Sequence, residues 1–436
     1  MTNIISKTLQ LKDQNIIFSL DMFEEKVHKG MKSLFYFAKL TYEPSACPEC
    51  GIKKCGANIV KNGTRTSTLT LTKVSALPAF LKLKKQRFFC RECRSSFTAK
   101  SSIVNEHCFI ANRVKQLIAD KATGTITKKY IAEECNVSEH TVQRVIHDVA
   151  SDIRQRPTDA LPKHLSFDEF KSVSSVDASM SFICLDNTSH RLVDIVYDRR
   201  KSSLEDYFLR YSRQARNSVE TICTDMYTPY ISLATSLFPN AKVIIDRFHI
   251  VQALNRELNK CRVSKMNESR YSNPRLYNKY KRYWKVLMTK EDNLCYQTYS
   301  YHRLFDWYTN TQGIAAYLLD QDPLLRGTYR VVHDLRNALE RHDWQRFEYT
   351  LNMAHTYNIS NGLKKVIRTL KKLKQAIQNT FEYKGFTNGP VEGTNNKIKV
   401  LKRGAYGYRN YQNFRDRILL TTRLYIPADK KIIQAA

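Results

Sequence analysis

The stretch from Asn388 to Asn413, NGPVEGTNNKIKVLKRGAYGYRNYQN, is the part of the sequence around which the rest of the chain is organised. Asn-Gly-Pro predicts a turn that opens a helix, because proline is pre-set for the first helical turn. On that helix Glu392 shares a face with residues at three- and four-residue spacing. These are Asn396, Lys399 and Arg403, and Lys402 belongs to the same basic run.

A carboxylate at one end of a strip of cations suits a site that holds a metal ion beside a nucleic-acid backbone. The simpler alternative is that Glu392 is only a first-turn acid, which the helix dipole favours. The upstream sequence decides between these two interpretations.

The composition favours a nucleic acid as partner. The chain has 436 residues, enough for roughly two or three domains, and its 71 Lys and Arg against 41 Asp and Glu give a formal net charge of +30. Such an excess predicts a polyanionic partner. No apolar run is long enough to span a bilayer, so we expect no membrane association. Eleven cysteines without a secretory leader predict a reduced, cytoplasmic protein.

Two cysteine pairs predict a zinc ribbon. Cys47-Pro-Glu-Cys50 and Cys90-Arg-Glu-Cys93 are separated by 39 residues that alternate like strands. A two-residue gap lets both thiolates of a knuckle reach one tetrahedral ion, and four thiolates leave no open position, so the zinc has a structural role. Cys55 is a spare thiol that is able to replace one ligand. Four unligated core cysteines are the alternative.

The segment from 112 to 150 predicts a helical bundle with a helix-turn-helix. A short helix over 130–135 is followed by a turn and by Ser138, a good N-cap for a second helix over 140–149. The outward face of that helix is predicted to meet DNA; an ordinary pair of surface helices is the alternative. The predicted DNA contacts on this face are His140, Gln143, Arg144 and His147.

After a linker over 156–163, the pattern changes to strands. Three strands and a helix are followed by two strand–helix units, and this is the order of a ribonuclease H-like α/β domain. The predicted strands are 165–170, 181–185, 192–197, 219–224 and 241–245, and the predicted helices are 203–215, 228–237 and 249–261. From 262 to 381 a Lys-, Arg- and Tyr-rich stretch predicts helices, among them 277–284, 335–347 and 362–379.

Three acids form a candidate metal site. Asp168 lies in the first strand, Asp225 follows a later strand, and Glu392 lies on the last helix. Carboxylates that share divalent ions activate a nucleophile for attack on phosphate, and hard oxygen ligands select Mg²⁺ or Mn²⁺. Each acid also has a local explanation, as a strand-edge acid, an N-cap or a first-turn acid.

Three further residues are expected near this site. Asp246 ends a strand and competes with Asp225 for the second position, and His249 follows at the same edge of the sheet, where active sites gather. Whether Glu169 shares a metal with Asp168 is left open by the sequence.

Taken together, these motifs resemble the ISL-three family of bacterial insertion-sequence transposases, over about residues 41 to 425. The motifs are the two CxxC knuckles, the helix-turn-helix, Phe167-Asp-Glu-Phe170, Thr224-Asp-Met-Tyr-x-Pro-Tyr230, Asp246-Arg-Phe-His249 and Gly389-Pro-Val-Glu-Gly-Thr-Asn-Asn396-Lys-x-Lys399-x-x-Lys402-Arg403.

The resemblance implies a DDE transposase with Asp168, Asp225 and Glu392 as catalytic acids. It implies that the amino-terminal modules bind the terminal inverted repeats of an insertion sequence in double-stranded DNA. It also implies a bacterial, nucleoid-associated protein that is at least a homodimer, since two DNA ends must be brought together. A non-catalytic DNA-binding regulator derived from a transposase, and a nuclease that cuts by DNA structure, are the alternatives.

The predicted fold class is a multidomain α+β protein. A zinc ribbon and a helix-turn-helix precede a ribonuclease H-like core that an all-helical insertion interrupts. The expected segments are a leader (1–40) with helical tendency over 21–40, the zinc ribbon (41–105), the helix-turn-helix domain (106–156), the first part of the core (160–261), the helical insertion (262–381) and the last part of the core (382–428).

Overall fold

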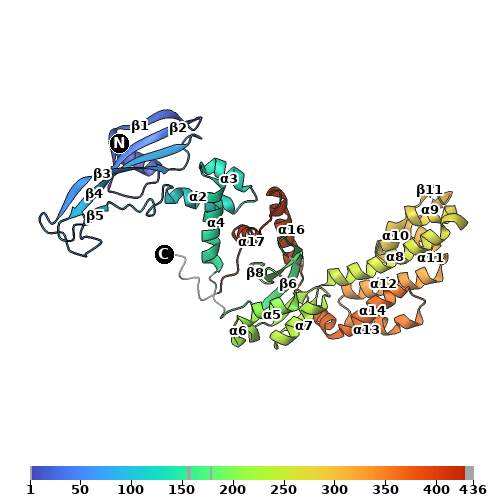
Figure 1. The fold of residues 1–436 in the computed structure, drawn as a ribbon. Coiled ribbons are helices and arrows are strands. Elements are labelled where there is room, and N and C mark those ends of the chain that lie inside the picture. The colour runs from blue at the N-terminus through green and yellow to red at the C-terminus, as the bar shows by residue number, and fades with distance from the viewer. Residues whose placement is uncertain (1, 155–158, 177–178, 428–436) are drawn as a thin grey trace. The chain divides into compact units, whose positions relative to one another are not determined.

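The computed structural model describes residues 2–154, 159–176 and 179–427 (Figure 1). The chain divides into two compact units, and the division falls within the long helix that carries Glu392. One unit consists of Met1–Arg156, Val173–Ser175 and Asn396–Arg423. The other consists of Pro157–Ser172, Val176–Asn395 and Leu424–Ala436. The predicted linker over 156–163 begins outside the described residues.

The first unit opens with a short helix, α1 (Thr2–Thr8), and a five-stranded sheet. Its strand order is β1-β2-β4-β3, with β5 paired to β4, and only the β2–β4 pair is parallel. The strands are β1 (Ile16–His28), β2 (Met31–Leu40), β3 (Ile59–Thr70), β4 (Ala79–Cys90) and β5 (Ser96–Thr98).

The predicted helical tendency over residues 21–40 is wrong, because this segment belongs to the β1–β2 hairpin. Lys29 and Gly30 both have positive φ angles, 51° and 79°, which is the backbone of a tight hairpin turn. Leu34 and Ala38 of β2 are buried against the parallel strand β4. Residues 16–40 are therefore part of the same sheet as the cysteine knuckles, and not a separate leader.

A group of helices completes the first unit. They are α2 (Asn112–Ala122), α3 (Lys128–Cys135), α4 (Glu139–Arg154) and α17 (Tyr411–Thr421), which packs against α2 and α4. Asn136 ends α3 in the left-handed conformation, and the Ser138 hydroxyl accepts a hydrogen bond from the Thr141 N–H, 3.2 Å away, as expected of an N-cap. The buried Arg417 of α17 donates to the Gly124 and Ile126 carbonyls.

The second unit is built on a five-stranded mixed sheet of order β10-β9-β6-β7-β8. Strands β6, β7 and β8 are antiparallel neighbours, whereas β9 and β10 run parallel to β6. The strands are β6 (His164–Lys171), β7 (Met180–Asp186), β8 (Leu192–Val196), β9 (Thr221–Thr224) and β10 (Lys242–Ile245), and the helices between them are α5 (Lys201–Leu209), α6 (Arg213–Asn217) and α7 (Thr228–Leu237).

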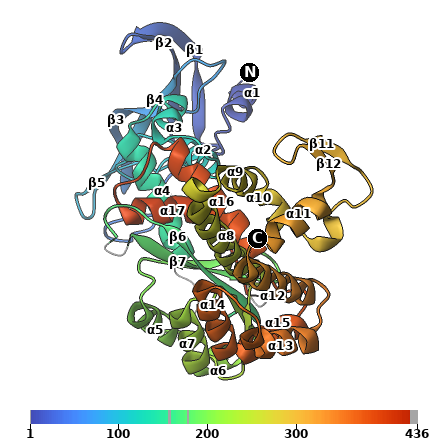
Figure 2. The same cartoon turned by 90° about the vertical axis from the view of Figure 1, so that its right-hand side faces the viewer.

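A helical region follows β10 and forms one continuous hydrophobic core with the sheet. Helices α8, α12 and α14 run side by side (Figure 2). The elements are α8 (Arg247–Ser272), α9 (Pro274–Arg282), α10 (Trp284–Met288), β11 (Ser300–His302), β12 (Trp307–Thr309), α11 (Thr311–Asp320), α12 (Pro323–Glu340), α13 (Trp344–Met353), α14 (Asn361–Lys372) and α15 (Lys374–Glu382).

Four details of this region differ from the sequence-based expectations. The predicted boundary at 261 falls inside α8, which is continuous across it. The predicted helix over 335–347 is two helices, because Asp343 caps a new start at α13, and the predicted helix over 362–379 breaks at Leu373. The region is not wholly helical, since β11 and β12 form a small hairpin.

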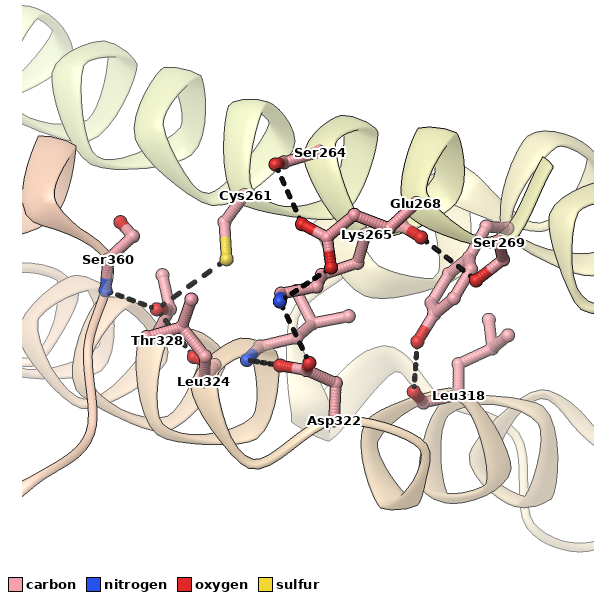
Figure 3. A network of polar contacts seen from close by, with 12 residues as sticks. Cys261, Ser264, Lys265, Glu268, Ser269, Leu318, Asp322, Leu324, Thr328 and Ser360 are labelled. Atoms are coloured by element: carbon pink, nitrogen blue, oxygen red, sulfur yellow. Dashed lines mark hydrogen bonds and ion pairs between the residues drawn. The ribbon is translucent and has the colours of Figure 1, made fainter. Parts of the chain in front are cut away.

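Polar contacts tie α8 to the rest of the helical region (Figure 3). The Lys265 ammonium lies 3.1 Å from the Asp322 carboxylate, which also caps α12 by accepting from the Leu325 N–H. Thr328 accepts from the Ser360 N–H at 3.0 Å, and the Cys261 thiol lies 3.8 Å from the same hydroxyl. Helix α8 is therefore anchored over its second half, while its first turns border the sheet.

The last helix of the region returns to the sheet and covers its edge. The Asn379 amide donates to the Val243 carbonyl, and the Thr380 hydroxyl bonds both the N–H and the carbonyl of Ile245. These bonds satisfy polar groups that the edge strand β10 would otherwise leave open. Helix α16 (Gly389–Gly404) then follows. None of the helices in the described ranges is both long and apolar enough to cross a membrane.

Candidate active site and zinc site

The four predicted zinc ligands lie together at one end of the first sheet. The Sγ atoms of Cys47, Cys50, Cys90 and Cys93 all lie within 4.8 Å of one another, with Cys47 and Cys93 3.7 Å apart and Cys50 and Cys90 3.9 Å apart. A tetrahedral zinc with bonds of about 2.3 Å places its sulfur ligands about 3.8 Å apart. The four thiols therefore fit structural Zn²⁺, and the exposed Cys55 lies outside the cluster.

The surroundings of the knuckles favour the thiolate form at two of the four cysteines, whereas burial and the neighbouring cysteines raise the pKa of Cys50 to about 12. The backbone N–H groups of Cys50 and Glu49 lower the pKa of Cys47 to about 6. The Ser95 hydroxyl, 3.0 Å from the Cys93 sulfur, lowers the pKa of Cys93. Hydrogen bonds to a thiolate stabilise its charge, so less energy is needed to deprotonate these ligands when zinc binds.

Sheet register explains why three acids gather in the second unit. In the parallel ladders, Ser166 pairs with Cys223, and Thr224 pairs with Ile245. Continuing the first ladder by two residues places Asp168 of β6 opposite Asp225, which follows β9. Continuing the second ladder by one residue places Asp225 opposite Asp246, which follows β10. The three acids therefore lie at the same level across the sheet. Neighbouring strands lie about 4.8 Å apart, so these carboxylates form a row at one edge of the sheet.

Desolvation raises the pKa of all three acids in this row. The pKa of Asp168 rises to about 6, mainly because its side chain is removed from water and also because the Asp225 carboxylate is near. Burial likewise raises the pKa of Asp225 and of Asp246, and His249 opposes the shift at both. A divalent cation that binds neighbouring acids offsets the free-energy cost of ionising them. Their oxygen atoms suit Mg²⁺ or Mn²⁺.

Asn395 is a functional candidate that sequence reasoning missed. Its amide Nδ2 donates to Asp168 Oδ2 at 2.8 Å and to the Glu169 carbonyl at 3.2 Å. Asn396, the next residue and a predicted DNA contact, is exposed, whereas Asn395 is buried. The signal was present in the sequence: Val391, Asn395 and Ile398 repeat at helical spacing, which marks the buried face of α16.

Glu392 lies on the helix that contacts Asp168, less than one turn before Asn395. Asn388, at the start of this helix, donates to the Phe167 carbonyl at 3.1 Å and fixes α16 against β6. The Glu392 side chain is exposed. In the described ranges, the four cysteines of the zinc site are the only group of three or more ligand atoms that lie within 4.8 Å of one another. The predicted catalytic acids Asp168, Asp225 and Glu392 do not form such a group.

The other two expected neighbours have defined partners. Glu169 is paired with the Arg199 guanidinium and accepts from the Tyr230 hydroxyl at 3.3 Å. His249 has its Nε2 3.9 Å from Asp246 Oδ2. A cavity of about 250 Å³ opens between Asp225 and His249.

The predicted DNA-binding face of α4 is only partly open. His140 and Arg144 are exposed, and Gln143 is half-buried with an Nε2 that has no partner in the described part of the chain. His147 places Nδ1 3.0 Å from the buried Asp416 carboxylate of α17, so this ring is engaged within the protein.

On the second half of α16, Asn396, Lys399 and Arg403 are exposed and Lys402 is half-buried. The Lys399 ammonium lies 3.4 Å from the Asn396 side-chain oxygen.

These features define a multidomain α+β protein that has a zinc ribbon and a row of buried and half-buried acids at one edge of a second, mixed sheet. The chain belongs to the ISL3 transposase family, whose profile, described as "Transposase", matches residues 165–418. A second profile, the zinc-finger of transposases IS204, IS1001, IS1096 and IS1165, matches residues 43–93.

Two curated proteins are similar to this chain. The transposase for insertion sequence element IS1001 of Bordetella parapertussis is 23% identical over 402 residues, which cover 88% of this chain and 90% of that protein. A protein of Lactococcus lactis subsp. lactis named "ATP-dependent protease" is 37% identical over 103 residues. That match covers 24% of this chain and spans about a third (32%) of the Lactococcus protein.

Proposed function

We propose that this chain is the transposase of a bacterial insertion sequence, and that it binds the terminal inverted repeats and cleaves and joins DNA strands by metal-dependent phosphoryl transfer. The observation that carries the proposal is the row of Asp168, Asp225 and Asp246 with raised pKa values, in a chain of the transposase family. The formal charge of +30 supports DNA as the substrate.

The architecture of the second unit supports a ribonuclease H-like core. Three antiparallel strands are followed by two parallel ones, and the acids lie on the central strand β6 and after its neighbour β9. Such a core gathers acids from separate chain segments at one sheet edge. The helical region between β10 and α16 then corresponds to an insertion that leaves the sheet intact.

In this proposal, Asp168, Asp225 and Glu392 hold Mg²⁺ or Mn²⁺, with Asp246 as the alternative to Asp225. The bound ions supply activation of a water or 3′ hydroxyl and stabilisation of the leaving oxygen. The chain orients its own ligands: Asn395 holds one oxygen of Asp168, and the Tyr227 N–H holds Asp225 Oδ1 at 2.9 Å.

Arg199 and Asn395 have different proposed roles beside the metal ligands. Arg199 is paired with Glu169, and it neutralises the one acid that would otherwise repel Asp168 from the same strand. Asn395 is a positioning residue, because it acts on the reaction through Asp168. The Asn395 Oδ1 atom is buried and has no partner among the described residues, so it is available to a metal-bound water.

The two helices α3 and α4 are proposed to form the helix-turn-helix that reads the inverted repeat. The left-handed turn at Asn136 and the Ser138 cap set the angle between them. Exposed His140 and Arg144 then face the major groove. Asn396, Lys399, Lys402 and Arg403 of α16 are proposed to contact phosphates, and a homodimer brings two DNA ends together.

The test uses the full-length protein with DNA that contains the element's ends, with and without Mg²⁺. Strand cleavage is expected to need Mg²⁺ and to fall at least about a hundredfold in Asp225→Ala and Glu392→Gln, since a lost metal ligand removes several kcal/mol of transition-state stabilisation. Binding of the same DNA is expected to persist in both variants.

The matched control is Asp206→Asn, which removes an exposed acid on α5 and is expected to cleave normally. Equal cleavage by the wild-type protein and both site variants would reject the catalytic assignment. DNA binding with no metal-dependent cleavage by the wild-type protein would instead support a regulator.

A further inference from the structure

The first turns of α8 carry a second cavity next to the acids. The cavity beside Asp225 and His249 has a volume of about 250 Å³, and an adjoining one has about 590 Å³. Gln252 and Arg256 line both cavities. The two spaces are therefore neighbours around the same helix, and a DNA strand bound at the acids lies beside the larger one.

Two aromatic side chains form the walls of the larger cavity. Phe248 of α8 and Trp284 at the start of α10 both line it, and they are 55% and 40% exposed. Helix α10 packs against α8, so these rings stand on two anchored elements. Large aromatic side chains left open in a pocket are platforms on which a flat ring stacks.

The cavity also has one polar side chain with an unused acceptor. Asn255 lines it, and the Asn255 Oδ1 atom is buried without a hydrogen-bond partner among the described residues. A turn of this side chain toward the cavity would let a ligand supply the missing hydrogen bond. Side-chain amides match the edges of nucleobases, and the guanidinium of Arg256, which lines both cavities, matches a phosphate.

From these contacts we infer that the larger cavity receives one unstacked base of the DNA strand whose phosphate lies at the acids. Phe248 and Trp284 stack on the base, Asn255 bonds its edge, and Arg256 binds the phosphate between the two cavities. This inference rests on the proposed function, because it takes the bound strand to be DNA at the acidic site. It adds to that function a subsite and a preference for a base that is easy to unstack.

The energetics favour bases that are already unpaired. Stacking on aromatic side chains stabilises a bound base. Removing a paired base from a duplex costs free energy, and the cost is smallest when the base is unpaired or mismatched. The free protein is therefore expected to prefer a duplex with an unpaired nucleotide over the same duplex fully paired.

The experiment measures binding of the full-length protein to two duplexes without divalent metal, so that no cleavage occurs. One duplex carries an unpaired 2-aminopurine, and the other has the same base paired with thymine. The unpaired duplex is expected to bind about tenfold more tightly, with quenching of the 2-aminopurine fluorescence as it stacks.

Variants test whether this cavity is responsible. Phe248→Ala and Trp284→Ala are each expected to remove most of the tenfold preference and the quenching, while binding of the paired duplex stays unchanged. Trp284→Phe keeps a ring and is expected to keep the preference. The controls are Tyr271→Ala, which removes another exposed aromatic of α8, and Trp307→Ala, which removes the exposed tryptophan of β12.

Equal affinity for the two duplexes, or no fluorescence change, would overturn the inference. The inference would also be overturned if Trp284→Ala weakened binding of both duplexes equally while its thermal unfolding stayed unchanged. These results are separable from the catalytic test: no preference in a wild-type protein that cleaves DNA with Mg²⁺ rejects this inference alone, and absent cleavage with a retained preference rejects the catalytic proposal alone.

Discussion

Asp168 shows how one residue acquires an unusual property from its position. It is a half-buried acid on the central strand, level with Asp225 and bonded to the Asn395 amide. Desolvation dominates its electrostatics and raises its pKa from 3.8 to about 6. A raised pKa means that the folded state binds this proton more tightly than the unfolded state does.

The consequence for stability has a definite sign. The favourable contribution of a protonated Asp168 is fully present below the unfolded-state pKa of 3.8 and is lost as the pH rises through about 6. Above pH 6, Asp168→Asn is therefore expected to raise the free energy of unfolding, by at most about 3 kcal/mol, because asparagine has no charge to desolvate. Below the unfolded-state pKa, this gain is expected to vanish.

Urea unfolding at both ends of this pH range measures the effect. Asp206→Asn, an exposed acid on α5, is the control and is expected to change little at either pH. Added Mg²⁺ is expected to stabilise the wild-type protein more than Asp168→Asn, since bound cation offsets the repulsion in the row of acids. An equal gain at both ends of the pH range would contradict the assigned cause.

At the scale of elements, the zinc knuckles organise the far end of the first sheet. Cys90 ends β4 and pairs with Ile59 of β3, so one ligand is fixed directly by the ladder. Strand β5 is only three residues long, and it pairs with β4 immediately after the second knuckle. A strand of three residues gains little stability from its own hydrogen bonds to β4, so the knuckle is the main constraint on the position of β5.

Removing a ligand is therefore expected to loosen this end of the sheet. Cys47→Ser is expected to lose the bound zinc and to expose β5 and the end of β4 to proteolysis, because a metal site with three thiolates binds more weakly. Zinc content after acid release and limited proteolysis measure the two effects.

Cys55→Ser is the matched control, since Cys55 is exposed and outside the cluster of four sulfur atoms. It is expected to keep its zinc and its resistance to protease. Equal zinc loss in the two variants would mean that Cys55 takes part in binding.

At the scale of the whole molecule, the net charge of +30 is expected to govern the proposed association with DNA. Cations that neutralise phosphates release counterions, so the logarithm of affinity falls linearly with the logarithm of salt concentration. We expect a steep slope for the full chain, and a slope reduced by about 1 in Arg144→Ala if Arg144 contacts one phosphate.

Binding titrations over a series of salt concentrations measure this slope. His140→Ala is the control on the same helix, because histidine carries no permanent charge, and its slope is expected to match that of the wild-type protein. An unchanged slope in Arg144→Ala would place this residue away from phosphate, and a loss of sequence preference alone would indicate contact with a base.

The sequence by itself determined the zinc ribbon and most local elements. CxxC spacing gave the four zinc ligands, because knuckle geometry is local. The strands that end before Asp225 and Asp246, and the helix that begins at Gly389, were predicted because alternation, apolar runs and Asn-Gly-Pro are local signals too.

Only the tertiary structure decided which residues meet. The β1–β2 hairpin was mistaken for a helix because its parallel partner β4 lies far along the chain and supplies the burial that makes β2 a strand. Asn395, not Asn396, reaches Asp168 because the buried face of α16 is fixed by docking on β6. Burial also set the pKa of Asp168, and desolvation depends on every element that surrounds a carboxylate, which no local pattern encodes.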